Sequence, residues 1–127
     1  MKGLDEPFLV SKVPLAMHTE VGGAIYISGH IPLDDEGYFV RGTVGPQTER
    51  VLQNIEALLK SIGSSKEEIV KTSVYLTAAK RDFDQMNEAY GAFFGQHRPA
   101  RTTCGVELAV DVLVEIEAIA VRGSASG

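Results

Sequence analysis

The stretch Val112–Val121 reads Val-Leu-Val-Glu-Ile-Glu-Ala-Ile-Ala-Val, a long and strongly β-prone run. Successive side chains of a strand point to opposite faces of a sheet. The even-numbered positions of this run, from Val114 onward, therefore form one apolar face. The odd-numbered positions mix aliphatic side chains with two carboxylates, Glu115 and Glu117. The run predicts a strand that has one apolar face and one face of mixed character.

The two carboxylates of this run can be interpreted in two ways. Burying one carboxylate without a partner costs several kcal/mol, roughly, unless the group is protonated or paired. Either the mixed face is solvated near Glu117 or carries a structural ion pair, or one carboxylate lies at a subunit boundary with a raised pKa suited to proton transfer. The spacing of Glu115 and Glu117 does not separate these interpretations.

Working outward from this strand, hydrophobic periodicity and turn residues predict the other elements. Residues 1–13 are weakly patterned and predict a short strand at most. The remaining predicted elements are, in chain order, strand Ala24–Gly29, strand Tyr38–Val40, helix Gln47–Ile62, strand Ile69–Thr77, helix Asp82–Phe94 and strand Arg101–Leu108. Within Ile69–Thr77 we expect one face to be formed by Val70, Thr72, Val74 and Leu76.

The predicted order is thus β-β-α-β-α-β-β in a single domain of the α/β (α+β) class spanning residues 1–127. The two amphipathic helices cover one face of a mixed sheet. The other face carries too many apolar residues to remain in water. Homo-oligomerisation is the simplest way to cover it.

Composition excludes several classes of function. The formal net charge is −5 and the 12 basic residues are scattered, so neither nucleic acid nor a membrane surface is an expected partner. The most nearly apolar stretch is too short and too charged to span a bilayer. A single cysteine, Cys104, and no secretory signal indicate a cytoplasmic protein. The three histidines are isolated, so we expect no metal site.

Arg101 follows Pro99-Ala100 at the start of a predicted strand. Its planar, permanently charged guanidinium is suited to bidentate recognition of a carboxylate, although the residue type and position alone favour a surface arginine with no such role. If the last two strands are neighbours, Arg101 and Glu115 together can bind a substrate carboxylate and activate water beside it.

Seven segments of the chain resemble, in order, those of the RidA family (also called YjgF/YER057c/UK114), whose members include enamine and imine deaminases. The resemblance covers residues 14–122, roughly the whole chain, and its most specific elements are Pro-Ala-Arg-Thr-Thr and Val-Glu-Ile-Glu-Ala-Ile-Ala. The segments are Ile27–Leu33, Gln47–Ile55, Ile69–Thr72, Phe83–Asn87, Tyr90–Phe94, Arg98–Thr103 and Val114–Ala120.

The resemblance implies a chorismate-mutase-like fold assembled as a homotrimeric barrel, with three ligand clefts between subunits. It identifies Arg101 as the residue that grips the substrate carboxylate and Glu115 as the residue that orients or activates water. It assigns the lining of the cleft to Ser28, Gly29, Asn87 and Thr103.

The implied reaction needs no cofactor. A reactive 2-enamino or 2-imino acid is hydrolysed to a 2-oxo acid and ammonia, so the expected partner is a small metabolite that bears a carboxylate. The alternative is a metabolite-binding or chaperone-like trimer without turnover. Ribonuclease activity, which the resemblance to endoribonuclease L-PSP proteins also suggests, disagrees with the negative charge and the lack of a basic groove.

Two departures from the family pattern concern the substrate. Leu15 stands where archetypal members carry a tyrosine, which removes a polar contact from the cleft and changes its shape. The stretch between Arg101 and Glu115 is also one residue shorter than is typical and lacks the usual turn. The substrate is therefore expected to differ from the usual one, and a larger enamine is possible.

Overall fold

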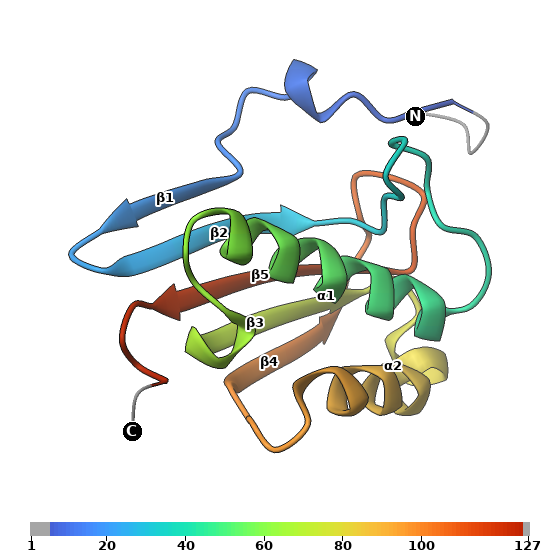
Figure 1. Ribbon diagram of the computed structural model, residues 1–127. Coiled ribbons are helices and arrows are strands. Elements are labelled where there is room, and N and C mark those ends of the chain that lie inside the picture. The colour runs from blue at the N-terminus through green and yellow to red at the C-terminus, as the bar shows by residue number, and fades with distance from the viewer. Residues whose placement is uncertain (1–5, 126–127) are drawn as a thin grey trace.

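A computed structural model describes residues 6–125, and Figure 1 shows a single sheet with two helices packed against it. The chain order is η1 Val10–Lys12, β1 His18–Val21, β2 Ala24–His30, α1 Val44–Ser61, η2 Lys66–Glu68, β3 Ile69–Leu76, α2 Ala79–Phe94, β4 Ala100–Gly105 and β5 Val114–Val121. The strands lie in the order β1-β2-β5-β3-β4. All neighbours are antiparallel except β3 and β4, which are parallel. The predicted mixed sheet with two helices is confirmed.

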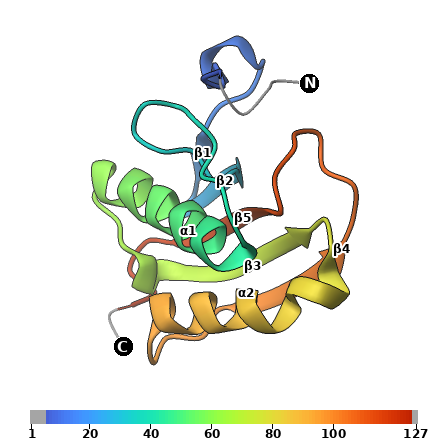
Figure 2. The same cartoon turned by 90° about the vertical axis from the view of Figure 1, so that its right-hand side faces the viewer.

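Strand β5 is the middle strand of this sheet, and its alternation divides the two faces. The side chains from Val114 through Ala120 at even positions are buried, whereas the odd positions are only partly buried or exposed. Both helices pack on the buried side, α1 over β2 and β5 and α2 over β3 and β4 (Figures 1 and 2). The helices contribute a stripe of fully buried residues to the same core: Val44, Val51, Leu52, Ile55, Leu59 and Met86.

The sheet begins with a hairpin that the sequence analysis missed. Strands β1 and β2 pair antiparallel around Gly22 and Gly23, whose φ angles are 57° and 84°. Two consecutive residues with positive φ form the tight turn that matches strand twist, and glycine adopts it without a Cβ clash. The predicted strand Tyr38–Val40 is wrong, because this segment makes only an isolated bridge between Leu33 and Phe39.

The described part of the predicted N-terminal strand is also not a strand, since Val10–Lys12 forms a single 3-10 turn. Residues 1–5 lie outside the described residues. Helix α1 begins three residues earlier than predicted, which places Pro46 in its first turn, where the missing amide hydrogen has no intrahelical partner to lose.

A bulge changes one facing prediction in β3. The register with β5 shifts between Ile69 and Lys71, so Val70 is left out of the alternation and is exposed. Ile69 takes the buried position instead, and Thr72, Val74 and Leu76 continue on that face. An extra residue in one strand exchanges the inward-facing and outward-facing positions on its N-terminal side, and a prediction from simple alternation cannot show where this happens.

Shortening a side chain of the central strand will test its place in the core. Ile116 is 0% exposed, so Ile116→Ala is expected to lower the free energy of unfolding by about 2–5 kcal/mol in urea denaturation. The control is Val21→Ala on the edge strand β1, where the side chain is 67% exposed and the expected change is within about 0.5 kcal/mol. Equal losses at both positions would contradict the assignment of β5 to the core.

Candidate functional site

Three of the residues predicted to form a site lie together around one pocket. Leu15, Gly29 and Glu115 line a pocket with a volume of about 380 Å³ at the end of the sheet where β2 finishes and β5 begins. This volume is within the range of about 300–1,000 Å³ that is usual for small-molecule sites. We call this cavity the Glu115 pocket. Its walls come from the N-terminal segment, the β2–α1 loop and the loop between β4 and β5.

Glu115 lies half-buried in this pocket with its carboxyl group against the backbone of β2. A Cβ at position 29 would overlap the Glu115 carboxylate oxygen and lie 3.0 Å from its carboxyl carbon, so Gly29 is needed for this close approach. Burial raises the pKa of Glu115, and the negative charge of Glu117 raises it further. A carboxyl group of this kind keeps its proton to a higher pH than usual and can both accept and donate one.

Glu117, the second carboxylate of the strand, is exposed and held differently. It accepts a hydrogen bond from the phenol of Tyr75 on β3, and this contact raises the pKa of Tyr75. Of the two interpretations given for these carboxylates, the solvated face fits Glu117. The raised pKa belongs to Glu115.

The N-terminal wall of the pocket is fastened to β2. The Ser28 hydroxyl donates a hydrogen bond of 2.6 Å to the carbonyl of Ala16, and the Ser28 amide donates one of 3.0 Å to the carbonyl of Met17. Ser28 therefore does not line the pocket but fixes the segment that carries Leu15 beside it. Further along, the Phe8 amide donates to the Gly37 carbonyl at 2.8 Å, which ties this segment to the β2–α1 loop.

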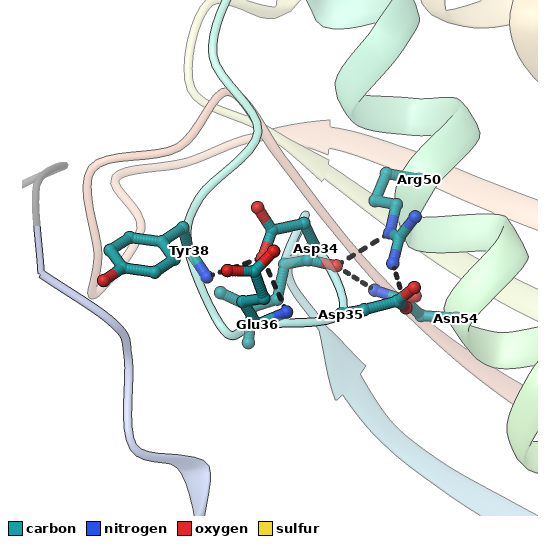
Figure 3. Close-up of polar contacts among 7 residues, drawn as sticks. Asp34, Asp35, Glu36, Tyr38, Arg50 and Asn54 are labelled. Atoms are coloured by element: carbon teal, nitrogen blue, oxygen red, sulfur yellow. Dashed lines mark hydrogen bonds and ion pairs between the residues drawn. The ribbon is translucent and has the colours of Figure 1, made fainter.

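The β2–α1 loop is in turn held by helix α1, as Figure 3 shows. The Leu33 carbonyl accepts hydrogen bonds from Arg50 Nε and Asn54 Nδ2, both of 2.8 Å. Arg50 also forms an ion pair of 2.7 Å with Asp35. Within the loop, Asp34 Oδ1 accepts from the backbone amides of residues 36 and 38, each at 2.9 Å. These bonds give the pocket a firm wall despite its lack of regular structure.

His30 is a pocket residue that the sequence analysis set aside as isolated. It is buried, and its Nδ1 lies 2.9 Å from the carbonyl of Ser28. A carbonyl only accepts hydrogen bonds, so Nδ1 carries the proton and Nε2 is the basic nitrogen of the neutral ring. Burial lowers the pKa of His30, because the charged form loses hydration, and the bond to Ser28 offsets this only in part.

Arg101, the other residue predicted to be central, lies at a different place. Its guanidinium carbon is 4.9 Å from the ring centre of Tyr90 and 5.8 Å from that of Phe83, both on helix α2. Within residues 6–125 the Arg101 side chain has no ion-pair or hydrogen-bond partner. The cation is thus positioned by aromatic faces while its donors remain available.

Tyr90, whose ring lies under the Arg101 guanidinium, is itself held in place by neighbouring side chains. Its hydroxyl is 2.7 Å from the hydroxyl of Thr72 on β3, and its ring packs against Phe94 with ring centres 4.7 Å apart. Burial raises the pKa of Tyr90, so the phenol stays neutral. From the sequence this helix was predicted only as an amphipathic helix that covers the sheet. That pattern did not reveal that Phe83 and Tyr90 face an arginine.

Asn87 and Thr103 accompany Arg101. Asn87 is on the same side of α2 as Phe83 and Tyr90, and Thr103 is two residues after Arg101 on the helix-facing side of β4. Asn87 Oδ1 and Thr103 Oγ1 are buried and have no hydrogen-bond partner. An unsatisfied buried polar atom costs about 1–3 kcal/mol. We call the group formed by Phe83, Asn87, Tyr90, Arg101 and Thr103 the Arg101 surface.

Within one chain the Arg101 surface and the Glu115 pocket do not meet. The expectation that the last two strands are neighbours is wrong, because β3 lies between β4 and β5. Arg101 pairs with Thr72, which is buried under α2, whereas Glu115 pairs with Tyr75 on the opposite face of the sheet. The seven predicted residues therefore fall into two separate groups, one at the Glu115 pocket and one at the Arg101 surface. Ser28 supports the wall of the Glu115 pocket.

Residues 6–125 lack two features that would indicate other functions. This part of the chain contains no group of three or more histidine, cysteine, aspartate or glutamate residues arranged to hold a metal ion. None of its helices is long and apolar enough to cross a membrane.

Comparison with known proteins identifies the family. A sequence profile described as Endoribonuclease L-PSP matches residues 10–122, so the chain belongs to this family, to which the names RidA and YjgF also apply. The resemblance seen in the sequence is confirmed.

Three relatives illustrate the range of the family. The chain is 43% identical over 111 residues to a RutC family protein of Pyrococcus abyssi, which covers 86% of this chain and 87% of the relative. It is 37% identical over 113 residues to the 2-iminobutanoate/2-iminopropanoate deaminase of Salmonella typhimurium, which covers 86% and 88%. The structure of E. coli TdcF with bound serine has a TM-score of 0.82 at 32% identity and covers 96% of this chain and 97% of that one.

Buried His30 predicts a pH dependence of stability. A histidine whose pKa is lower in the folded than in the unfolded protein stabilises the fold fully above about pH 6.5, and this contribution is lost as the pH falls below that value. His30→Gln keeps a donor for the Ser28 carbonyl but does not titrate. The difference in unfolding free energy between wild type and variant should therefore change in favour of the variant between pH 7 and pH 5. A constant difference across this range in urea titrations would show that His30 is not buried in its neutral form.

Proposed function

We propose that this protein hydrolyses 2-imino and 2-enamino acids to 2-oxo acids and ammonia at a site formed by two copies of the chain. The observation that carries the proposal is the complementarity of the two groups. One copy offers a guanidinium with free donors at the Arg101 surface, and the other offers a half-buried carboxyl of raised pKa in the Glu115 pocket. A deaminase relative at 37% identity supports the reaction class.

The roles of the two groups follow from charge. A substrate carboxylate is attracted to Arg101, which can grip it with two parallel hydrogen bonds. The same carboxylate is repelled by Glu115, so the reacting carbon, one bond further along the substrate, is the part that comes to Glu115. The side chains of Asn87 and Thr103, each partly buried, add further polar groups beside Arg101.

The chemistry then needs only water and proton transfer. With the imine nitrogen protonated as an iminium, Glu115 takes a proton from water as the water oxygen bonds to the imine carbon, and the π electrons of the C=N bond become the lone pair of nitrogen. In the resulting carbinolamine, Glu115 returns its proton to nitrogen, the C–N bond breaks as the carbonyl forms, and the hydroxyl proton passes to the departing ammonia. The products are a 2-oxo acid and ammonia, and no cofactor is consumed.

The assembly we propose is a closed ring. The Arg101 surface and the Glu115 pocket are different parts of the molecule, so a contact that joins one to the other is heterologous, and heterologous contacts that close produce rings. The family resemblance implies three copies, and we propose a trimer. In such a ring the mixed face of the sheet, with half-exposed Tyr26 and the carboxylate of Glu117, lies at the centre of the assembly.

Activity is tested by supplying imines from a PLP-dependent dehydratase and following 2-oxo acid formation above the spontaneous rate. Wild type is expected to accelerate release, and Arg101→Ala to lower kcat/KM at least about tenfold because a charge-assisted bidentate contact is lost. Arg81→Ala is the matched control, since Arg81 is an exposed arginine on α2 that pairs with Asp82. If wild type changes no rate but binds the 2-oxo acid through Arg101, the protein is a metabolite-binding trimer rather than an enzyme.

Subunit mixing tests whether the site is shared. Arg101→Ala and Glu115→Gln chains should each lose most of their activity alone, because every site lacks one group. In oligomers co-assembled from equal amounts of both, about a quarter of the contacts join an intact Arg101 to an intact Glu115, so activity should return in part. A mixture that stays inactive although native mass spectrometry shows mixed trimers would place both groups in the same chain. A monomeric mass for wild type would exclude the ring itself.

A further inference from the structure

We infer that the substrate of this protein carries a large apolar side chain, which occupies the Glu115 pocket. This inference rests on the proposed function, because it concerns the substrate class of the same site. It is carried by the composition of the pocket walls, by the position of Leu15 and by the way the polar wall groups are engaged.

The pocket walls are mainly hydrocarbon. Nine of the fourteen lining residues are apolar side chains, and one more is Gly29. They come from three separate segments of the chain: the N-terminal segment contributes Leu15 and Val13, the β2–α1 loop contributes Leu33, and the β4–β5 loop contributes Val110. An apolar surface assembled from three segments favours a ligand group that leaves water on binding.

Most polar groups in the walls already hold the protein together. Asn54 donates to the Leu33 carbonyl, Asp34 accepts two backbone amides, and His30 donates to the Ser28 carbonyl. These bonds support the loop seen in Figure 3 and the end of β2. Glu115 and the Nε2 nitrogen of His30 are the polar groups left, and Glu115 is the one poised to act on the substrate. A small polar side chain entering the pocket would lose hydration and find few partners among the mainly apolar walls.

Leu15 is placed where it distinguishes substrates. It is 49% exposed, yet the segment around it is fixed by the hydrogen bonds from Ser28 to residues 16 and 17. A leucine held at the pocket wall keeps apolar area in contact with water until a ligand covers it. Because the hydrogen bonds from Ser28 hold this wall in place, a large apolar group buries more of the Leu15 side chain than a methyl group does and therefore binds more tightly.

Orientation leads to the same conclusion. With the substrate carboxylate on Arg101 of one copy and the imine carbon beside Glu115 of the next, the side chain is directed away from the Arg101 surface. The remaining volume on that side is the apolar pocket. The geometry therefore points to imines derived from branched aliphatic or aromatic amino acids, in preference to imines derived from alanine or serine.

Binding of the product 2-oxo acids tests this inference without turnover. We expect wild type to bind 4-methyl-2-oxopentanoate at least about tenfold more tightly than pyruvate in NMR titrations, since each added carbon in a fitted apolar pocket contributes. Leu15→Asn, which keeps the size of the side chain but makes it polar, should reduce this ratio by raising the Kd of the larger acid. Leu9→Asn is the matched control, because Leu9 is an equally exposed leucine (42%) in the same segment that does not line the pocket.

The same comparison is then made with imines released from leucine, phenylalanine and alanine by an amino acid oxidase in the presence of catalase. The inference is supported if kcat/KM rises with the size of the substrate side chain, mainly because KM falls and less because kcat rises. Equal or tighter binding of pyruvate, or a Leu15→Asn protein with an unchanged ratio, overturns it while leaving the deaminase proposal intact. Preferential binding of the larger acid without hydrolysis of any imine would retain the apolar pocket and reject the deaminase.

Discussion

Strand β5 is hydrogen-bonded along both edges, to β2 on one side and to β3 on the other, and the rest of the protein depends on this double pairing. Its even positions provide the apolar floor on which both helices pack, with Ile116 wholly buried near the middle. Because alternation is strict, the same pairing sends Glu115 to the other face, beside the end of β2. A shift of one residue would exchange the two faces and destroy the core and the pocket together.

The position of Glu115 is costly for the fold and useful for chemistry. Burial of its carboxyl raises the free energy of the charged form, which is the physical meaning of its raised pKa. Gly29 leaves room for the carboxyl where any side chain would collide with it. The buried, unsatisfied atoms of Asn87 and Thr103 are a second departure from an optimised core. Such departures from an optimised core are concentrated at functional sites.

The pocket itself is built from segments without regular structure, and their order comes from hydrogen bonds to regular elements. Helix α1 holds the β2–α1 loop through Arg50 and Asn54, and β2 holds the N-terminal segment through Ser28. Phe8 joins the loop and the segment through its amide and through ring contact with Phe39 at 5.8 Å. The shape of the pocket and the stability of the fold are thus linked, since a change that loosens α1 near Arg50 also loosens the apolar wall.

The sequence alone determined the local structure and the family. The alternation in β5, the apolar stripe of α1 and the glycine that ends it at position 63 depend on near neighbours in the chain, so their patterns are visible without coordinates. The tertiary structure decided what local patterns cannot contain: that β3 lies between β4 and β5, that a bulge turns Val70 outward, and that Tyr90 faces Arg101. Strand order and long-range contacts are set by the packing of segments distant in sequence. For that reason Arg101 and Glu115 could be predicted as site residues from the sequence, whereas only the structure showed that they lie on opposite faces of the sheet.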